Sequence, residues 1–569
     1  MMGYSALDIA KTALFAQQIG LQVTSHNIAN VNTPGYSRQQ VTLGPYPPIP
    51  YPFGNVGRGV RVEGIRRFYD RFLTLQLDRQ RSSKAYWETR HGVLGHLDAV
   101  YNELDDQGLG RVLDQFWQAW QDLANDPQGY GERAALLNTA RSLAENLNYK
   151  ARQLMEIAED LEGQMVQVAE EVNRLAAQIA RLNVQIVEAE SSGQGANDLR
   201  DERDRLVGEL SECVNCTIFE DDQGRVSVFI GGSPLVEGAN AYWRMEVQEV
   251  AADGRMKVEL VSSSGSRVDV TDRINGGKLG GLLSLRNGEL VEVQTRLDAF
   301  ARALIFAVNR VHSQGEGLER YSEVTGAYRV EDSTVPLEEA GLPFEVQAGS
   351  FWIRVFDGDG NLVAEREIAV DPSAQSLEDV ASTINAAFSG GEVVATVQDG
   401  RLTLQAASGY ELSFASEGGT RPDTAGFLAA LGINAFFTGQ RALDIAVNAD
   451  LEASPNLIAT ASCASTPGDN AVALGIADLE GEALLEGATP GDYYAGIVGL
   501  VAVATQDADR RTEFEEAMLQ SLENRRSEVS GVNLDEEMVN LMKFQRAYEA
   551  AAKVITAVDE MLETLISMR

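Results

Sequence analysis

Residues 154–189 read LMEIAEDLEGQMVQVAEEVNRLAAQIARLNVQIVEA. Apolar residues recur here at alternating spacings of four and three, at Leu154, Ala158, Leu161, Met165, Val168, Val172, Leu175, Ile179, Leu182, Ile186 and Ala189. This heptad pattern, sustained over about five repeats, predicts one long helix of the coiled-coil type. Such a helix needs partner helices that cover its apolar stripe.

Both ends of the chain predict helices that could serve as partners. Near the N-terminus, seven-residue intervals separate Leu7, Leu14, Leu21 and Ile28. Near the C-terminus, two rows with the same interval are Leu534, Leu541, Tyr548, Ile555 and Leu562, and Met538, Gln545, Ala552, Asp559 and Ile566. Because the second row includes polar residues, we expect this helix to be marginal alone and ordered when packed against others.

The middle of the chain predicts antiparallel strands. GRVSVFIGG (224–232) and RMKVELVSS (255–263) alternate apolar and polar residues. FWIRVFDGDGNLVAEREIAV (351–370) and VVATVQDGRLTLQA (393–406) each place an Asp-Gly turn between such strands, which predicts two hairpins. SLEDVASTINAAF (376–388) predicts a short helix between them, and helix returns over 278–312 and from about residue 490.

This order predicts an α+β multidomain protein, an elongated helical rod built from both termini with inserted antiparallel β-rich outer domains. Five parts are expected: a terminal helical domain of 1–45 and 532–569; a Pro/Gly-rich connector, 46–64; a long-helix rod domain of 65–215, 275–315 and 465–531; a β-rich domain of 216–274 and 316–342 with 438–464; and an outer β-rich domain, 343–437.

The composition excludes several kinds of partner. The chain has 47 Lys and Arg against 84 Asp and Glu among 569 residues, a formal net charge of −37. Nucleic-acid binding needs cations that neutralise phosphates, and an anionic membrane surface would repel such a chain. No apolar run is long enough for a membrane-spanning helix, so we expect no nucleic acid and no membrane insertion. The N-terminus lacks a basic segment followed by a continuous apolar one, so we expect no cleavable secretory signal.

The motifs that would carry chemistry are incomplete. None of the four histidines lies in an HExxH arrangement, and RINGGKLGG (273–281) lacks the first glycine and the Ser or Thr of a phosphate-binding loop. DGDGNL (357–362) begins like a calcium loop, but Ile368 stands where the bidentate glutamate belongs, so a hairpin tip is expected. We therefore predict no catalytic residue, no metal site, no cofactor and no enzymatic activity.

The cysteines allow two interpretations. Cys213 and Cys216 form a CVNC motif, and Cys463 is the only other thiol, too few for a four-cysteine zinc site. The motif ends a predicted helix rather than beginning one, which favours a structural role over a redox role. In an exported protein, the pair could instead close a local disulfide.

The charged segment NDLRDERDRLVGEL (197–210) precedes this motif. Arg200 with Asp204, and Asp201 with Arg205, are spaced as pairs on successive turns, worth a few tenths of a kcal/mol. We interpret the segment as a solvated helix start, capped by Asn197 or Asp198.

The stretch SHNIANVNTPGYSRQ (25–39) marks the end of the N-terminal helix. Asparagine competes with the helix backbone for hydrogen bonds, which favours a helix end near Asn27, Asn30 and Asn32. Pro34 disfavours helix in the residue before it, and Gly35 permits a positive φ. The pattern predicts a stop followed by a turn.

Three segments resemble one known family. TSHNIANVNTPGYSRQ (24–39), GNVGRGVRVEGIRRFYDRFL (54–73) and SGVNLDEEMVNLMKFQRAYEAAAKVITAVDEMLETLI (530–566) are similar to the signatures of bacterial flagellar axial proteins, the rod, hook and hook-associated family. The residues after Gly35-Tyr36, the 197–210 segment and the start of the last stretch resemble the hook-associated members. Residues 375–405 are similar to a small module found inserted in flagellins and hook-associated proteins.

The resemblance implies an exported structural protein of the hook–filament junction, cytoplasmic before export and extracellular in the flagellum afterwards. It implies export through the flagellar type III apparatus and termini that form a helical inner tube on assembly. It also implies four partners: further copies of the chain, the hook protein, a second junction protein (FlgL) and an export chaperone (FlgN-like) on the C-terminal helix. Alternatives are another axial protein, such as a hook subunit or an FlgL-like junction protein, or a secreted adhesin.

Under this resemblance the two terminal segments form the assembly interface, with asparagines able to bridge neighbouring subunits. The N-terminal residues are Leu7, Leu14, Leu21, Asn27, Ile28, Asn30, Asn32, Pro34, Gly35 and Tyr36. The C-terminal residues are Leu534, Met538, Leu541, Gln545, Tyr548, Ala552, Ile555 and Leu562.

Overall fold

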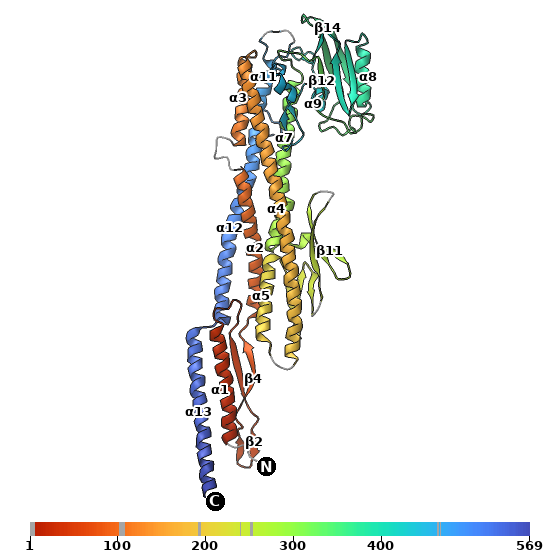
Figure 1. Cartoon of the computed structure of the whole chain (residues 1–569). Coiled ribbons are helices and arrows are strands. Elements are labelled where there is room, and N and C mark those ends of the chain that lie inside the picture. The colour runs from red at the N-terminus through yellow and green to blue at the C-terminus, as the bar shows by residue number, and fades with distance from the viewer. Residues whose placement is uncertain are drawn as a thin grey trace. The chain divides into compact units, whose positions relative to one another are not determined.

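The computed structural model describes residues 6–101, 108–191, 195–238, 241–250, 254–463, 466 and 468–568. The protein is α+β, with helices at both ends and antiparallel strands between them, as predicted (Figure 1). The chain divides into two compact units. Unit 1 comprises Met1–Val93, Asp160–Gly288 and Gln506–Arg569, and unit 2 comprises Leu94–Glu159 and Glu289–Thr505. Three long helices contribute residues to both units: α2 (Arg71–Tyr101), α4 (Tyr130–Glu190) and α12 (Pro490–Ser530).

In unit 1 the two ends of the chain pack against each other. Helix α1 (Ala6–Ala29) contacts helix α13 (Leu534–Ser567). The approach is close at Gly20, where a Cβ would lie 2.6 Å from Cε1 of Phe544. Strands β1 (Gln39–Pro45) and β4 (Val60–Arg67) form an antiparallel pair that contacts α1. The proline-rich segment between them is extended, as expected, and forms a hairpin of β2 (Ile49–Tyr51) and β3 (Gly54–Val56).

The predicted long helix is confirmed as part of α4. The side chains of Leu161, Met165, Val172, Leu175 and Ile179 are all buried, as the heptad pattern requires. One polar residue, Asn183, interrupts the buried face. Its amide donates to the carbonyls of Val226 and Gly238 and accepts from the Val226 N–H, so it fastens the helix to the strands that follow.

The rest of unit 1 is helix α5 (Asn197–Cys213), α6 (Gly277–Ser284) and two small antiparallel sheets. One sheet has the order β5 (Thr217–Glu220), β6 (Val226–Ile230), β7 (Ser233–Glu237) and β8 (Ala241–Tyr242). The other has the order β11 (Arg267–Asp269), β10 (Met256–Val261) and β9 (Arg244–Glu249). The predicted helix over 278–312 is interrupted, because a π-helical turn at Leu285–Glu289 separates α6 from α7 (Leu290–His312).

Unit 2 contains both predicted Asp-Gly hairpins. The first joins β13 (Gly349–Asp357) to β14 (Leu362–Val370), and the second joins β15 (Val393–Gln398) to β16 (Arg401–Ala406). Asp399 and Gly400 both have positive φ, as a two-residue hairpin turn demands. Strand β17 (Tyr410–Ser413) pairs with β13, and β12 (Glu323–Thr325) pairs with β16. The predicted short helix is α8 (Leu377–Ala387), closed by a capping box of Ser376 and Asp379.

The helical part of unit 2 surrounds an aromatic core. Trp120 of α3 (Leu109–Asn125) and Phe436 both contact the ring of His312, which is completely buried at the end of α7. The His312 Nδ1 bonds the carbonyl of Asn434, and its Nε2 accepts the N–H of Ala459. The remaining elements are α9 (Phe427–Leu431), α10 (Ala449–Ala453), α11 (Ala471–Ala477), β18 (Phe437–Thr438) and β19 (Ala446–Val447).

The expected β-rich domain of 216–274 and 316–342 with 438–464 does not form one unit. Residues 216–274 belong to unit 1, whereas the other two segments belong to unit 2. The reason is strand pairing: β5 to β11 pair only with one another, whereas Glu316 pairs with Ala461 and Tyr321 with Leu412.

Candidate assembly site at the chain ends

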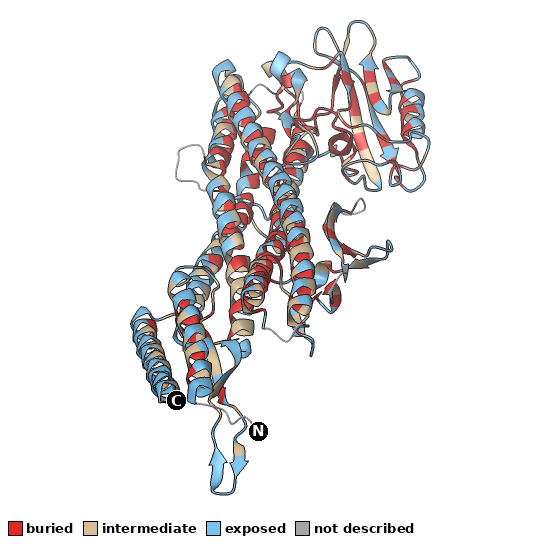
Figure 2. Cartoon of the chain, turned by 60° about the horizontal axis from the view of Figure 1, so that its bottom comes forward, coloured by how far each residue is buried: buried red, intermediate tan, exposed pale blue. Residues whose placement is uncertain are grey.

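The predicted apolar rows of α1 and α13 are only partly covered by their contact with each other. Leu14, Leu21 and Ile28 of α1 are half-buried, and so are Leu541, Tyr548, Ala552 and Ile555 of α13. Leu7, Leu534, Met538 and Leu562 are exposed to between 36% and 48%. Gln545 is exposed as well. Most of α13 is therefore pale blue or tan in Figure 2, despite its apolar composition.

Further large apolar side chains on the same two helices are exposed. Phe15 is 59% exposed and Met561 is also 59% exposed. Ile9, Val539, Met542 and Val554 are exposed too. The two helices thus present more apolar surface than their mutual contact uses, and water-exposed apolar surface of this kind marks an interaction site.

The end of α1 is held by Asn27, whose side chain is 1% exposed. Its Nδ2 donates to the carbonyl of Gln39 and to Oε2 of Glu537, both at 2.9 Å. Its Oδ1 accepts from the hydroxyl of Tyr36 at 2.8 Å and from the N–H of Gln39 at 2.9 Å. An amide has two donors and accepts about two bonds, so the hydrogen-bonding capacity of Asn27 is used inside the chain. The expectation that Asn27 bridges to a neighbouring subunit is therefore wrong.

Glu537 is the C-terminal partner in this arrangement and is 2% exposed. Its Oε1 accepts from the Arg38 guanidinium, with Nε at 2.9 Å and Nη2 at 2.8 Å. Arg38 also bonds Glu536 at 2.8 Å, and its N–H donates to the carbonyl of Ser530. Burial, with the charges of nearby carboxylates, raises the pKa of Tyr36, so its hydroxyl stays a donor. We call Asn27, Tyr36, Arg38, Gln39 and Glu537 the terminal knot.

The segment after the turn is also tied to α5. The N–H of Ser37 donates to Oδ2 of Asp201 at 2.9 Å, and Nη1 of Arg67 bonds Oδ1 of the same carboxylate at 2.7 Å. Arg67 lies 2.8 Å from Asp204 as well. Burial raises the pKa of Asp204, although Arg67 and Arg203 oppose this shift. Gln39 reaches Asp198 with its side-chain amide, at 2.7 Å.

The interpretation of 197–210 as a solvated helix start is therefore wrong. Asp201 is 6% and Arg203 is 1% exposed. The expected pairs on successive turns do not form. Arg200 bonds Glu190 and Glu220, while Arg205 bonds Glu202 and Glu209. The helix has Ala196 at its N-cap with no side-chain cap, because the Asn197 and Asp198 side chains bond Ile65 and Gln39 instead. Arg200 thus finds its partners outside the segment, whereas Arg205 pairs within it but with other residues than expected.

The other residues of the predicted turn lie on or near the surface. Asn30 bonds the carbonyl of His26 and accepts from the Thr33 hydroxyl, whereas Asn32 and Pro34 are exposed. Gly35 has a φ of +83°, as expected for this turn. Its carbonyl accepts from Nη2 of Arg526 at 3.1 Å.

The disulfide between Cys213 and Cys216, considered as an alternative for an exported protein, is not formed in this structure, and both residues are free thiols. Cys213 is the last residue of α5 and is buried, whereas the Cys216 sulfur lies 3.2 Å from the hydroxyl of Ser211. Burial raises the pKa of Cys213 to about 11 and that of Cys216 to about 12, so neither is a reactive thiolate near neutral pH.

The sequence reasoning missed Arg38, Arg67, Asp201 and Glu537. All four lie within the quoted segments, but only Asp201 was assigned a partner there, and that partner, Arg205, is not the one it has. The sequence did contain one indication that Glu537 is buried, because its charge lies between the apolar residues Leu534 and Met538.

Within the described part of the chain, no cluster of three or more His, Cys, Asp or Glu side chains is placed to hold a metal ion. The helices described include none that is both long and apolar enough to span a membrane.

Comparison with known proteins places three matches along the chain. Residues 94–326 match the helical domain of the flagellar hook-associated protein FlgK. Residues 7–36 match the flagella basal body rod protein family, and residues 523–568 match the C-terminal family of the flagellar basal body rod proteins FlgEFG. The two rod-family matches cover α1 from residue 7 with its turn, and all of α13.

Relatives of similar length are also found. Flagellar hook-associated protein 1 of Bacillus subtilis is 27% identical, over 99% of this chain and 98% of its own. Its counterpart in Escherichia coli is 26% identical, over 99% and 100%. The structure of the flagellar hook junction protein FlgK from Burkholderia pseudomallei superposes with a TM-score of 0.53 at 15% identity, covering 80% of this chain and all of that one, which supports the fold.

Proposed function

Because the chain belongs to the hook-associated protein 1 family of flagellar axial proteins, we propose that it is a structural subunit of the hook–filament junction that assembles with copies of itself. The observation that carries this proposal is the uncovered apolar surface of α1 and α13, because burial of that surface between subunits would drive assembly. Head-to-tail contacts of this kind build helical or ring-shaped assemblies.

In this proposal the predicted terminal residues, other than Asn27, form the subunit interface. Residues 1–45 and 532–569 line the inner tube, the rod domain of 65–215, 275–315 and 465–531 surrounds it, and the β-rich segments lie outside. Asn27 contributes inside each subunit, because its hydrogen bonds to Gln39 and Glu537 hold the two ends of the chain together.

The proposed partners are the hook protein on one side and a second junction protein, FlgL, on the other. Before assembly, an export chaperone of the FlgN kind would cover the apolar face of α13, and the type III apparatus would export the chain. The exposed side chains of Met538, Met542 and Met561 support this, because methionine-rich helix faces suit adaptable binding. The protein has no catalytic role in this proposal.

The test uses a strain that lacks its own copy of the protein. Chains without residues 1–40, or without 535–569, should leave unit 2 folded but give no hook–filament junction and no motility. A labelled antibody against the full-length chain should mark the boundary between hook and filament. Labelling along the hook or the filament would favour another axial role, and truncated chains that still build junctions would refute the proposed interface.

A further inference from the structure

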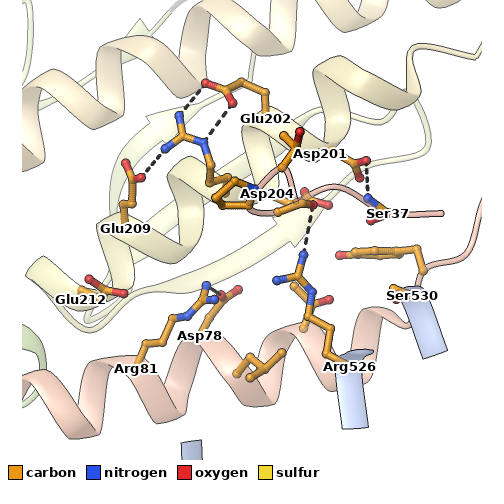
Figure 3. A pocket seen from close by; sticks show the side chains of 17 residues that line it. Ser37, Asp78, Arg81, Asp201, Glu202, Asp204, Glu209, Glu212, Arg526 and Ser530 are labelled. Carbon is orange, nitrogen blue, oxygen red and sulfur yellow. Dashed lines mark hydrogen bonds and ion pairs between the residues drawn. The ribbon is translucent and has the colours of Figure 1, made fainter. Parts of the chain in front are cut away.

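A cleft of about 580 Å³ lies in unit 1, between α2, α5, α12 and the turn that contains Pro34. Figure 3 shows acidic side chains on several sides of it. Asp78, Asp201, Glu202, Asp204, Glu209 and Glu212 line the cleft, against Arg81, Arg205 and Arg526. Its lining therefore carries six acidic and three basic residues.

Most of these acidic residues already have a partner. Arg205 bonds Glu202 and Glu209, Asp204 pairs with Arg67, and Asp201 accepts from Ser37 and Arg67. Arg526 donates to the carbonyl of Gly35 and has no ion pair among the described residues, although its charge lowers the pKa of Asp78.

Two carboxylates in the cleft remain without a hydrogen-bonded partner among the described residues. Glu212 is half-buried and has no ion pair. The Asp78 side chain is only 5% exposed, and its Oδ1 has no hydrogen bond. The nearest cation, Nη1 of Arg81, lies 3.8 Å from that oxygen and is shared with Glu523, whose carboxylate lies 3.9 Å from Nη2.

Burying a carboxylate without a hydrogen-bonded partner costs stability. Burial raises the pKa of Asp78 to about 7, although the charges of Arg81 and Arg526 oppose this shift. A chain with asparagine in place of Asp78 would fold more easily, because the side chain would keep its shape without the buried charge. The geometry therefore suits a cation that arrives from outside the chain.

We propose that the cleft binds an arginine or lysine side chain of a second copy of this chain, with Asp78 and Glu212 as its acceptors. The inference rests on the proposed self-assembly. Charge complementarity supports a second copy as the source, because unit 1 also carries exposed cations whose side chains have no ion pair among the described residues. They are Lys11, Arg66, Arg71, Lys543, Arg546 and Lys553.

The experiment compares two double variants in the strain that lacks its own copy. Asp78→Asn/Glu212→Gln removes both negative charges while keeping the shape of the side chains. Glu188→Gln/Asp222→Asn removes two exposed charges of the same unit, outside the cleft. Incorporation into isolated hook–basal bodies, measured by quantitative immunoblot, should fall at least about tenfold for the cleft variant and stay unchanged for the control.

Folding is checked separately. The midpoint of thermal unfolding of the cleft variant should equal or exceed that of the wild type, because an uncompensated buried charge has been removed. Normal incorporation of the cleft variant, or a lowered midpoint that accounts for its loss, would overturn the proposal.

The source of the cation is tested by charge reversal. Arg66→Glu/Arg71→Glu, Lys543→Glu/Arg546→Glu and Lys11→Glu/Lys553→Glu are made alone and together with Glu212→Lys. One of the three reversals should reproduce the loss, and Glu212→Lys should restore incorporation in that background. If none of the reversals is rescued, the second-copy assignment is overturned. A wild-type chain that never enters the junction would instead contradict the proposed function itself.

Discussion

Asn27 shows how one amide can hold two ends of a chain. All of its hydrogen-bonding groups are used, and one partner, Glu537, is itself buried and paired with Arg38. Removing the amide leaves the carbonyl of Gln39 and the carboxylate of Glu537 each short of a donor in a dry environment, which costs more than a surface hydrogen bond.

We therefore expect Asn27→Ala to weaken the terminal knot by about 2–4 kcal/mol. Amide exchange in residues 34–40 and 534–540 measures this local stability. Asn32→Ala is the matched control, because Asn32 is exposed, and it should change exchange by less than about 0.5 kcal/mol. Equal effects of the two substitutions would show that the knot does not hold the chain ends.

His312 makes the stability of unit 2 depend on pH. Complete burial lowers its pKa to about 4, against an ordinary value of 6.5. Between these two values the unfolded chain binds the proton and the folded chain does not, so stability rises with pH across this window and is lost as the pH falls. The difference of about 2.5, at about 1.4 kcal/mol for each pH unit, amounts to about 3 kcal/mol.

The expected result is a free energy of unfolding for unit 2 that falls by about 3 kcal/mol more from pH 7 to pH 4 in the wild type than in His312→Gln. Urea unfolding followed by tryptophan fluorescence measures this, because Trp120 lies beside His312. His91→Gln alters a histidine with an exposed side chain and should leave the pH slope unchanged. Identical slopes for His312→Gln and the wild type would contradict the assignment.

Sequence patterns predict the burial of a side chain well where apolar residues recur with a fixed period. They predict it poorly where the partners of the side chain come from distant segments. The burial of Leu161, Val172 and Ile179 follows from spacing alone. The burial of Asp201 and Arg203 does not, because their neighbours, Ser37, Arg67 and Glu220, come from other segments. The Asn27 cluster was recognised as a helix end, but its partner Glu537 could not be deduced from local sequence.

At the scale of elements, the close packing of α1 on α13 depends on the absence of a side chain at Gly20. A Cβ there would lie within 3 Å of three atoms of the Phe544 ring. Glycine is otherwise a poor residue inside a helix, costing about 1 kcal/mol relative to alanine. The residue therefore reduces the helix propensity of α1 and permits contact between the two helices.

Gly20→Ala should consequently destabilise the α1–α13 pair by about 1–3 kcal/mol, although alanine favours helix. Gly163→Ala in α4 is the control with the opposite expected sign, because nothing lies within 4 Å of its Cβ position and stability should rise by up to about 1 kcal/mol. Amide exchange in α13 and in α4 reports the two effects. Adding Phe544→Leu to Gly20→Ala should restore the stability of the α1–α13 pair. If stability is not restored, contact with the Phe544 ring is not the cause of the destabilisation.

The elements themselves were largely predictable. Both Asp-Gly hairpins, the short helix α8 and the long helix α4 are confirmed, because each combines a strong period with clear turn residues. The break at Leu285–Glu289 was missed, since an apolar row of helical period continues across it. The expected domain of 216–274 and 316–342 with 438–464 included both Glu316 and Ala461, which do pair. Its assignment of 216–274 to the same domain was wrong, because local sequence does not show which strands pair with which.

At the scale of the whole molecule, the net charge of −37 opposes association of the free chain. The uncovered apolar faces of α1 and α13 favour it. Salt shifts this balance, because the Debye length falls from about 30 Å at 0.01 M to about 3 Å at 1 M while apolar attraction persists.

We expect self-association of the purified protein to increase with salt over this range, as measured by sedimentation velocity. A chain that lacks 535–569 should remain monomeric at every salt concentration, because it has lost α13. A buried cation in the acidic cleft would be screened less than exposed charges, so its loss in Asp78→Asn/Glu212→Gln should lower association at all salt concentrations. Association that weakens as salt rises would mean that exposed charges, not apolar surface, drive it.

The hydrogen bond between Asn27 and Glu537 joins residues 510 positions apart. Closing a loop of that length in a flexible chain carries an entropic cost of about 5–6 kcal/mol. Glu537 is also the last residue of the terminal knot to be synthesised. In a growing chain, Asn27 therefore lacks this hydrogen-bond partner until almost the whole chain has been made. Translation order and loop entropy thus delay closure of the chain ends, and under the export proposed above this delay would keep the ends open for longer.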